Sequence, residues 1–205
     1  MRDHDPDINP WRTLTRRPVY ENPWIAVEHH EVLKPNGDPG IYGLVHYRNH
    51  AVGVVPVDAG GFTWLVGQYR YPLRRYSWEI PEGGVPEGED PASGALRELK
   101  EETGLSAGRM FPIAGPIALS NSVSDEEGTL YVAWDLREGT AEPDDTEQLR
   151  LRRVSLRDAL SMVLSGEITD ALSMLALLRL PLLRDAADTP EDLRTLLMRG
   201  LGVPE

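Results

Sequence analysis

The first part of the chain alternates apolar and polar residues with the period of a β-strand. Between residues 11 and 47 this alternation is interrupted by two turn signals, Glu21-Asn22-Pro23 and Lys34-Pro35-Asn36-Gly37. Successive side chains of a strand point to opposite faces of a sheet, and Asn, Pro and Gly favour the backbone geometry of turns. The pattern predicts a small antiparallel β meander, which we assign to an N-terminal unit of residues 1–48.

The apolar runs that follow predict further strands. Residues 51–57 and 62–69 flank Asp58-Ala59-Gly60-Gly61, which is a signal for a hairpin turn between them. Residues 129–136 are a third strand candidate, and residues 149–154 are a weaker one. We therefore expect a sheet in the remainder of the chain.

A capped helix is expected over residues 91–103. Asp90 can accept hydrogen bonds from the free N–H groups of the first turn, and Pro91 suits the first helical position. Gly104 can adopt the left-handed conformation that ends many helices. The three signals agree on both ends of the helix.

Three more helices are expected towards the C-terminus. Leucine spacing predicts them over residues 156–164, over residues 168–180 with Pro181 as the end, and from Thr189-Pro190 to Gly200. Strands and a central helix followed by more helices indicate an α/β fold, with a mixed sheet covered by helices. We assign this second domain to residues 49–205.

Composition narrows the classes of partner. The 33 acidic residues exceed the 21 basic ones, so the formal charge is −12. Such a charge repels phosphate backbones and anionic lipids, and we expect neither a nucleic-acid nor a membrane partner. A small anionic ligand is compatible with this charge, because a bound divalent cation reverses the charge of a local site.

The absence of cysteine excludes disulfides, thiolate metal sites and cysteine nucleophiles. The polar N-terminal residues do not resemble a secretion signal. The richest apolar stretch, residues 172–183, is interrupted by Arg179 and Pro181 and is too short to span a bilayer. We expect a cytoplasmic protein.

Three glutamates lie on one face of the central helix. Glu98, Glu101 and Glu102 are three and four positions apart, which places them in adjacent directions facing outward. Like charges at this spacing cost an isolated helix a few tenths of a kcal/mol per pair, so they do not serve its stability. Oxygen ligands of this kind suit Mg²⁺ or Mn²⁺. The spacing alone fits a metal site and a solvated acidic face equally well.

The segment before this helix, residues 78–90, is rich in Gly and Pro and is expected to be a loop. Glycines allow a backbone to approach a ligand closely, and backbone carbonyls are further ligands for a hard cation. An ordinary turn has the same composition.

The ordered pattern of this region resembles a known signature. Gly83 is followed after five residues by Glu89, after seven more by Arg97-Glu98-Leu99, and then at single-residue gaps by Glu101-Glu102 and Gly104-Leu105. Every defined position resembles the signature of the Nudix hydrolase family. The resemblance implies an α/β/α sandwich with a mixed sheet, and a hydrolase acting on nucleoside diphosphates linked to another moiety.

The resemblance also implies roles for the motif. Mg²⁺ or Mn²⁺ would be held by Glu98, Glu101, Glu102 and, through a turn at Gly83, by the backbone carbonyl of Glu82. Arg97 would orient the helix glutamates, and Glu89 would help to hold the loop. Gly83, Glu89, Arg97 and Gly104 are thus expected to be structural.

Hydrolysis of a pyrophosphate also needs a general base. In the subfamily that cleaves ADP-ribose and related nucleotide sugars, the base lies on a loop after the helix, which Ser124-Asp125-Glu126-Glu127 resembles. We favour Glu126, with Glu127 and Glu101 as alternatives. For each of these residues, a place in an ordinary surface turn fits the sequence nearly as well as a catalytic role does.

Two segments before the motif extend the resemblance to this subfamily. Gln68-Tyr69-Arg70-Tyr71-Pro72 and Trp78-Glu79-Ile80-Pro81 resemble its strand and approach loop. Arg70 would bind a phosphate, and Glu79 would contact substrate or metal. An ion pair with one of the many acids is the alternative for Arg70.

The N-terminal meander is also similar to that of this subfamily, whose members form homodimers through the unit and donate aromatic side chains to the base of the substrate. Trp24, Tyr42 and Tyr47 are the candidates for such stacking. Filling of a core or interface is the more usual role of such residues.

One departure concerns specificity. The subfamily carries a proline where this chain has Ser120-Asn121-Ser122, so a range of nucleoside diphosphate sugars wider than ADP-ribose is expected. The expected reaction yields a nucleoside monophosphate and a sugar phosphate. Two alternatives remain open: hydrolysis of dinucleoside polyphosphates or nucleoside triphosphates, and a noncatalytic nucleotide-sugar sensor, against which the intact glutamates argue.

Overall fold

The computed structural model describes residues 8–142 and 148–202 of the chain. The chain forms two compact units, Met1–Asn49 with Ala118–Glu126, and His50–Ile117 with Glu127–Glu205. The two domains expected from the sequence, residues 1–48 and 49–205, differ from these units in the placement of Asn49 and of Ala118–Glu126. Residues 1–7, 143–147 and 203–205 of those domains lie outside the described residues. The domain assignment stays a prediction.

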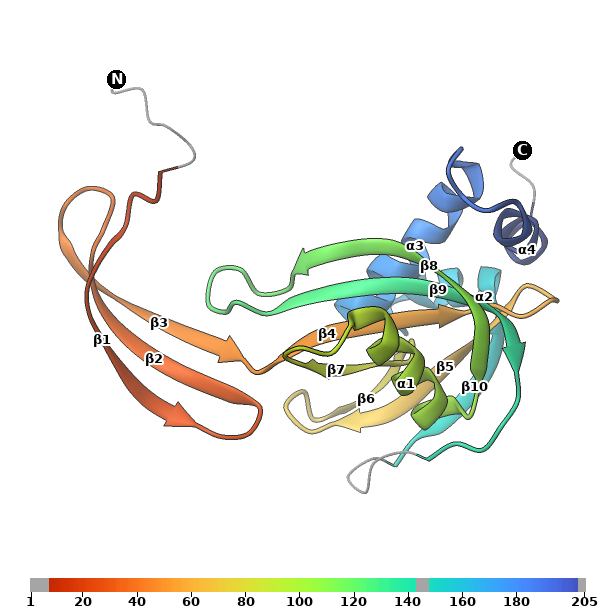
Figure 1. The fold of residues 1–205 in the computed structure, drawn as a ribbon, viewed down its shortest axis with the longest axis horizontal. Helices are drawn as coiled ribbons and strands as arrows, with labels where there is room; N and C mark the ends of the chain where they lie inside the picture. Colours follow the sequence, from red (N-terminus) through yellow and green to blue (C-terminus); the bar gives the residue numbers. More distant parts are fainter. Residues whose placement is uncertain (1–7, 143–147, 203–205) are drawn as a thin grey trace. The chain divides into compact units, whose positions relative to one another are not determined.

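The N-terminal unit contains the expected meander. Its antiparallel sheet has the order β1-β2-β3 (Figure 1), with bounds β1 Arg12–Glu21, β2 Ile25–Leu33 and β3 Pro39–Tyr47. At the first turn the side chain of Asn22 accepts hydrogen bonds from the backbone N–H groups of Trp24 at 2.9 Å and Ile25 at 2.8 Å. The turn signal read from the sequence is therefore confirmed, with Asn22 as the residue that closes it.

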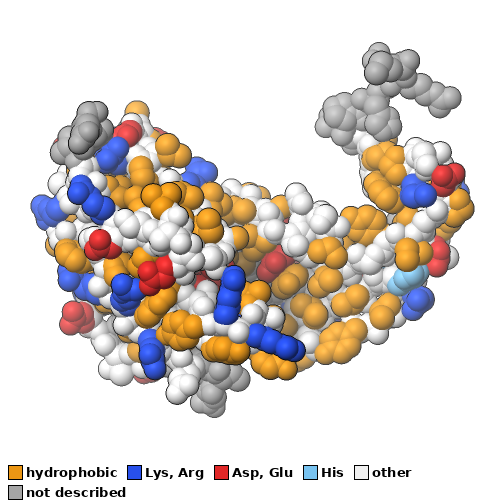
Figure 2. All heavy atoms as spheres, turned by 180° about the vertical axis from the view of Figure 1, so that it is seen from behind, with side chains coloured by type: hydrophobic (Ala, Val, Ile, Leu, Met, Phe, Trp, Pro, Cys, Tyr) orange, Lys and Arg blue, Asp and Glu red, His pale blue; other side chains and the backbone are white. Residues whose placement is uncertain are grey.

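Much of the apolar surface of this unit is exposed. Every residue of β1 is exposed, and in β2 only His30 and Val32 are buried. Figure 2 shows hydrophobic side chains on the surface of the unit; the large exposed ones in its strands and first turn are Leu14, Val19, Tyr20, Trp24, Ile41 and Tyr47. A three-stranded sheet with so little buried side-chain area has a small core.

The second unit is built on two sheets (Figure 1). One has the order β7-β4-β9-β8, in which β4 and β9 are parallel, and the other is antiparallel with the order β10-β5-β6. The strands are β4 Asn49–Pro56, β5 Phe62–Arg70, β6 Arg75–Glu79, β7 Glu82–Pro86, β8 Ser106–Ala118, β9 Glu127–Arg137 and β10 Arg150–Ser155. The expected mixed α/β fold is confirmed.

Helices cover both faces of these sheets. The helix α1 contacts β5, β7 and β9, whereas α2 contacts β5 and β10 and α3 contacts β9; Figure 1 places α1 in front of the strands and α3 behind them. Their bounds are α1 Pro91–Thr103, α2 Leu156–Ser165, α3 Ala171–Asp185 and α4 Glu191–Leu201. In residues 8–142 and 148–202, none of the helices combines the length and apolarity needed to cross a lipid bilayer.

The central helix α1 has the predicted bounds and caps. The Asp90 side chain accepts the backbone N–H of Ser93 at 3.0 Å, and Pro91 opens the helix. Gly104 has φ 74° and its N–H donates to the carbonyl of Lys100 at 2.8 Å. Local side-chain chemistry at the two ends accounts for the length of the helix.

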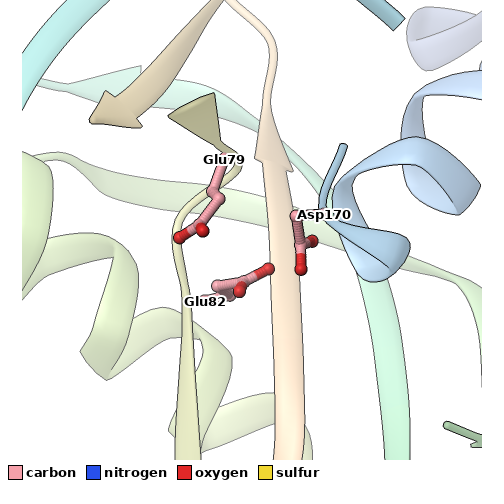
Figure 3. A group of neighbouring side chains, drawn as sticks. All are labelled: Glu79, Glu82 and Asp170. Atoms are coloured by element: carbon pink, nitrogen blue, oxygen red, sulfur yellow. The ribbon is translucent and has the colours of Figure 1, made fainter. Parts of the chain in front are cut away.

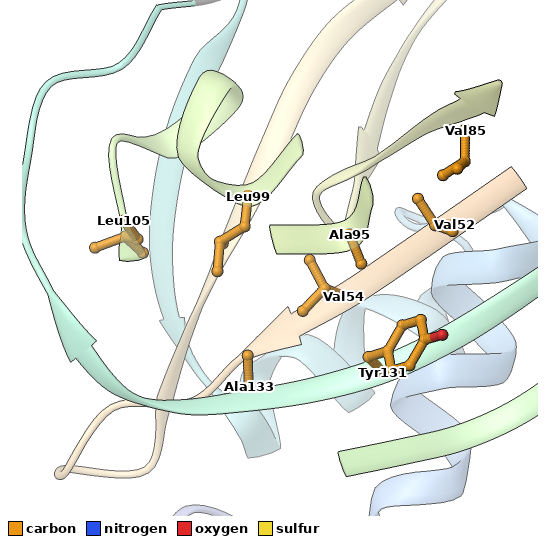
Figure 4. Packing of buried hydrophobic residues seen from close by; sticks show 8 residues of the cluster. All are labelled: Val52, Val54, Val85, Ala95, Leu99, Leu105, Tyr131 and Ala133. Carbon is orange, nitrogen blue, oxygen red and sulfur yellow. The ribbon is translucent and has the colours of Figure 1, made fainter. Parts of the chain in front are cut away.

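A buried cluster fixes α1 to the sheet (Figure 4). Ala95 and Leu99 of the helix pack against Val54 of β4 and Ala133 of β9, and Leu99 is fully buried. The other members are Val52, Val85, Leu105 and Tyr131. Burying a leucine side chain contributes roughly 1.5–3 kcal/mol, so this cluster holds the helix rigidly in place.

The hairpin expected between β4 and β5 is wrong. The turn itself forms, since Asp58 Oδ1 accepts the backbone N–H groups of Gly60 at 2.8 Å and Phe62 at 3.0 Å. The two strands nevertheless belong to different sheets. The residues of β4 from Val52 to Pro56 are buried, as in a central strand of a sheet that is covered on both faces. This strand therefore pairs with β7 and β9, and not with β5.

Two expected helix ends are also wrong. Pro181 lies inside α3, which continues to Asp185, because the buried Leu177 and Leu180 stabilise the helix by more than the loss of one backbone hydrogen bond costs. Gly200 lies inside α4, where an added Cβ would come within 2.5 Å of the Gly61 carbonyl oxygen. That glycine allows two backbones to approach closely and does not end the helix.

Residues 78–90 are less of a loop than expected, because β6 reaches Glu79 and β7 occupies Glu82–Pro86. The long strand β8 was not predicted either. The sequence of β7, Glu-Gly-Gly-Val-Pro, has low β propensity. Its strand conformation comes from pairing with β4, which a local pattern does not contain.

Candidate active site

The three glutamates of α1 differ in exposure. The side chain of Glu101 is 40% exposed and that of Glu98 is 14% exposed, whereas Glu102 is buried at 3%. The expectation that all three face outward is therefore wrong for Glu102. The cause is β7, which packs against α1 and covers part of its acidic face.

Gly83 makes this packing possible. It lies in β7, and an added Cβ would come within 2.5 Å of Glu98 Oε1, far closer than a normal contact. Because Gly83 is a residue of the strand β7, the turn expected at this position is wrong. The glycine leaves space for the carboxylate of Glu98.

The backbone of Glu82 lies beside the helix glutamates. Its N–H donates to Glu102 Oε2 at 3.1 Å. This bond joins the first residue of β7 to the last turn of α1. The expected use of the Glu82 carbonyl as a metal ligand stays a prediction.

Arg97 connects α1 to the preceding segment. Its Nη1 donates to Glu98 Oε1 at 2.8 Å and to Glu101 Oε2 at 2.9 Å, and its Nη2 donates to the Gly84 carbonyl at 3.1 Å. Its Nε lies 3.5 Å from Glu89 Oε1. Burial lowers the pKa of Arg97, but the neighbouring carboxylates, Glu98 first, raise it by more, so Arg97 stays cationic. Arg97 thus contacts two of the three helix glutamates, and its orienting role stays a prediction.

Arg70 forms ion pairs with Glu79 and Glu82. Its Nε and Nη2 donate to the carboxylate of Glu79 at 2.9 Å and 2.5 Å, and Nη2 also donates to Glu82 Oε1 at 3.2 Å. Glu79 is only 2% exposed. The ion pair that the sequence left as an alternative for Arg70 is thus present, and a phosphate contact stays a prediction.

A second carboxylate group surrounds this ion pair. Glu79 at the end of β6, Glu82 at the start of β7 and Asp170 before α3 point towards one another (Figure 3), with ligand atoms within 4.8 Å of each other. Burial, together with the charges of Asp170 and Glu79, raises the pKa of Glu82 well above its usual value. Within the described residues, Glu82 Oε2 is buried without a hydrogen-bond partner. Such a group has the donor atoms to hold a hard cation.

Asp170 was missed by sequence reasoning. Its side chain accepts the backbone N–H of Ser173 at 2.7 Å and so caps α3, which begins at Ala171 and not at the expected residue 168. An Asp before a helical pattern is a recognisable capping signal. Its proximity to Glu79 and Glu82 depends on the packing of α3 and has no local signal.

The candidate general base lies in the N-terminal unit. Glu126 is the last residue of Ala118–Glu126, and its carbonyl accepts the N–H of Leu119 at 3.0 Å. Burial raises the pKa of the partly buried Glu126. Glu127 begins β9 and is exposed, and Glu101 lies on α1. The choice among the three stays a prediction.

The three candidate stacking residues have different surroundings. Trp24 is 67% exposed, and Tyr47 is also exposed. Tyr42 donates its hydroxyl hydrogen to the Ser122 carbonyl at 2.6 Å and makes an edge contact with Trp11 at a centroid distance of 5.4 Å. Tyr42 is thus part of the packing of its own unit, and base stacking stays a prediction for all three.

Comparison with protein families gives two matches. The family described as NUDIX domain matches residues 47–175, which include the whole of α1 and β7. The family described as nucleoside diphosphate sugar hydrolase N-terminal domain matches residues 11–45, which include β1 and β2. The two matches follow one another along the chain.

Individual proteins are similar over most of the chain. An ADP-ribose pyrophosphatase of Bacillus subtilis is 34% identical over 162 residues, which are 78% of this chain and 86% of that protein. A methanol dehydrogenase activator of Bacillus methanolicus is 32% identical over 167 residues, covering 80% and 89% of the two chains. A solved structure titled as an ADP compounds hydrolase has a TM-score of 0.79 at 21% identity, covering 91% of this chain and all of that one. The last likeness concerns the fold.

Proposed function

The chain belongs to the Nudix family, and from this premise we propose that it hydrolyses the pyrophosphate bond of a nucleoside diphosphate sugar of the ADP-ribose type. The products are a nucleoside monophosphate and a sugar phosphate. The observation that carries this substrate class is the N-terminal match to nucleoside diphosphate sugar hydrolases, joined to a catalytic match with intact glutamates. Similarity to an ADP-ribose pyrophosphatase over most of both chains supports it.

The proposed cofactor is Mg²⁺ or Mn²⁺. The residues fit such an ion, because the donor set of Glu98, Glu101, Glu102 and the Glu82 carbonyl consists of oxygen atoms only, as hard cations prefer. Gly83 leaves the room that the carboxylate of Glu98 needs beside β7. When bound, such an ion neutralises pyrophosphate oxygens and lowers the pKa of a coordinated water.

The side chains of the protein supply the rest. Arg97 holds Glu98 and Glu101 in position through its bonds at 2.8 Å and 2.9 Å. Glu126 accepts the proton of the attacking water at its carboxylate, and its raised pKa makes it a stronger base than an exposed glutamate. Arg70 is available to a phosphate when it exchanges part of its pairing with Glu79, which positions the guanidinium.

A substrate panel tests the proposal. ADP-ribose, ADP-glucose, GDP-mannose, a diadenosine polyphosphate and a nucleoside triphosphate are incubated with the protein and Mg²⁺ or Mn²⁺, and the products are separated by chromatography. We expect a nucleoside monophosphate and a sugar phosphate from one or more of the sugars. Preferred cleavage of the polyphosphate or the triphosphate would contradict the proposal and assign the protein to that class of substrate. Binding of a sugar without cleavage would make it a sensor.

A pair of matched variants ties the reaction to the candidate site. Glu102→Gln removes a charge from a buried carboxylate that accepts the Glu82 N–H, and should lower turnover by at least about 100-fold. Glu87→Gln makes the same change at an exposed position and should hydrolyse the substrate normally. Equal turnover in the two variants at limiting Mg²⁺ contradicts the metal assignment.

We also propose that the protein is a homodimer formed through the N-terminal unit. Support comes from the exposed apolar side chains of that unit, among them Val19 and Ile41. Sedimentation equilibrium should give twice the chain mass. Ile41→Glu should shift the equilibrium to the monomer, and a wild-type monomer would refute the proposal.

A further inference from the structure

The segment that carries Glu126 is bound to strand β3. The N–H of Val45 donates to the Val123 carbonyl at 2.9 Å, and the N–H of Asp125 donates to the Val45 carbonyl at 3.3 Å. The Tyr42 hydroxyl adds its bond to the Ser122 carbonyl. The segment Ala118–Glu126 connects β8 to β9 of the second unit, yet its hydrogen bonds make it part of the N-terminal unit.

One side-chain pair completes this attachment. His46 Nδ1 lies 2.6 Å from Asp125 Oδ2, and the backbone N–H of Tyr47 donates to Asp125 Oδ1 at 3.0 Å. Both oxygens of Asp125 are therefore held by consecutive residues of β3. Since Asp125 directly precedes Glu126, these bonds restrict the position of the Glu126 backbone.

His46 lies between two carboxylates. Its Nε2 is 3.5 Å from Glu28 Oε2, which is itself 2.7 Å from His30 Nε2. The hydrogen bond to Asp125 raises the pKa of His46 by more than burial lowers it, and the charges of Asp125 and Glu28 raise it further. A cationic His46 donates from both ring nitrogens, which strengthens the bond to Asp125.

We propose that His46 is a positioning residue for hydrolysis, which acts through Asp125 to hold Glu126 where it accepts the proton of the attacking water. His46, Asp125 and Glu126 all belong to the N-terminal unit, for which a role in dimerisation is also proposed. The inference rests on the proposed function, in which Glu126 is the general base.

The expected effect on Glu126 depends on what the pair of His46 and Asp125 holds in place. A single exposed ion pair contributes little, about 0–1 kcal/mol. Four other bonds keep the segment on β3, so losing the pair does not detach it; the loss frees one of the two carboxylate oxygens of Asp125, the residue before Glu126, and allows a local shift there. A base displaced by about 1 Å loses up to about 100-fold in rate while substrate affinity is little changed.

Three variants separate charge, donor and position. His46→Phe keeps a ring and removes the donor, and His46→Asn keeps a neutral donor close to the place of Nδ1. His29→Phe is the matched control, because His29 lies on the neighbouring strand β2 with a different partner, Glu31 Oε1 at 3.0 Å. We expect kcat of His46→Phe to fall by about 10- to 100-fold with KM within about threefold of wild type. His46→Asn should recover most of kcat, and His29→Phe should match wild type.

A double variant tests whether His46 acts through Glu126. In a Glu126→Gln background, adding His46→Phe should cause no further loss of kcat, since the base that it positions is already gone. Independent losses that multiply would overturn the proposal, as would wild-type kcat in His46→Phe. If His46→Phe does not fold, Asp125→Asn takes its place in the test. This variant keeps the shape of the side chain and should cause the same fall in kcat.

Hydrogen exchange separates this inference from the proposed function. Mass spectrometry of peptides covering residues 118–127 should show faster exchange in His46→Phe than in wild type or in His29→Phe. Unchanged exchange would overturn the positioning role even if kcat fell. Wild-type kcat in Glu126→Gln would refute the assignment of the base, and the positioning of that base with it. The exchange rates would then report whether His46 still holds the segment.

Discussion

Replacing Gly83 with alanine should damage the candidate metal site while leaving the fold stable. The added Cβ would lie within 2.5 Å of both Glu98 Oε1 and Glu98 Oε2, and carbon and oxygen atoms in contact normally lie about 3.4 Å apart. The carboxylate of Glu98 must therefore move by about 1 Å. That movement also breaks its hydrogen bond with Arg97 Nη1 at 2.8 Å.

The backbone does not oppose the substitution. Gly83 lies in β7 without a positive φ, so alanine adopts its conformation without strain, and exchanging a strand glycine for alanine favours folding by roughly 0.5–1 kcal/mol. The steric cost at Glu98 offsets this gain. We expect the free energy of unfolding to change by less than about 1 kcal/mol and kcat to fall by about 100-fold, the cost of misplacing a group by 1 Å.

The assay compares two glycines. Turnover of ADP-ribose is measured against Mg²⁺ concentration for Gly83→Ala and for Gly43→Ala, whose added Cβ meets nothing within 4 Å in strand β3. Only Gly83→Ala should lose turnover and require more Mg²⁺, while thermal unfolding of both remains near wild type. If Gly83→Ala turned over within about threefold of wild type at every Mg²⁺ concentration, the steric argument would be refuted.

Three further predictions concern the core, the cofactor and pH. Leu99→Ala should destabilise the protein by about 2–5 kcal/mol in urea unfolding, because the side chain is fully buried beside Val54 and Ala133; a smaller loss would mean that the cavity collapses. Chelation of divalent ions should abolish turnover, and added Mg²⁺ should restore it without a change in the far-ultraviolet circular dichroism; activity that survives chelation contradicts the oxygen-ligand site. Asp125→Asn should lower the pKa of His46 in an NMR titration, because that pKa is raised first by the hydrogen bond to Asp125. The bond's contribution to stability should be fully present below the unfolded pKa of His46 and be lost as the pH rises through the folded pKa, which urea unfolding at a series of pH values measures against Asp125→Asn.

Residues close together in the chain explain what could be predicted. The caps Asp90 and Gly104 act on the helix that they adjoin, so α1 was predicted with its observed bounds. The turn at Asn22 is closed by hydrogen bonds to residues two and three positions away. The spacing of Glu98, Glu101 and Glu102 likewise follows from helix geometry. In each case the partners of the interaction are near in sequence, so a local pattern contains them.

Contacts between distant residues explain the errors. Glu102 is buried because β7 packs on α1, and β7 is a strand although it reads as a loop. Asp170 reaches Glu79 and Glu82 across more than eighty residues of chain, through the placement of α3. Pro181 remains helical because Leu177 and Leu180 are buried. Burial and pairing outweigh local propensity at these positions.

The segment Ala118–Glu126 illustrates the same division within one candidate site. Glu126 could be proposed from the sequence, because it is an acidic residue in a segment that follows the helix. Its attachment to β3 through His46, Tyr47 and Val45 joins residues about eighty positions apart, and no local pattern announces such a bond. The candidate chemistry of this protein could therefore be predicted from its residue types and their spacing. The contacts that bury Glu102 and hold Glu126 form only when strands and helices pack, because burial and hydrogen bonding between distant residues depend on the whole fold.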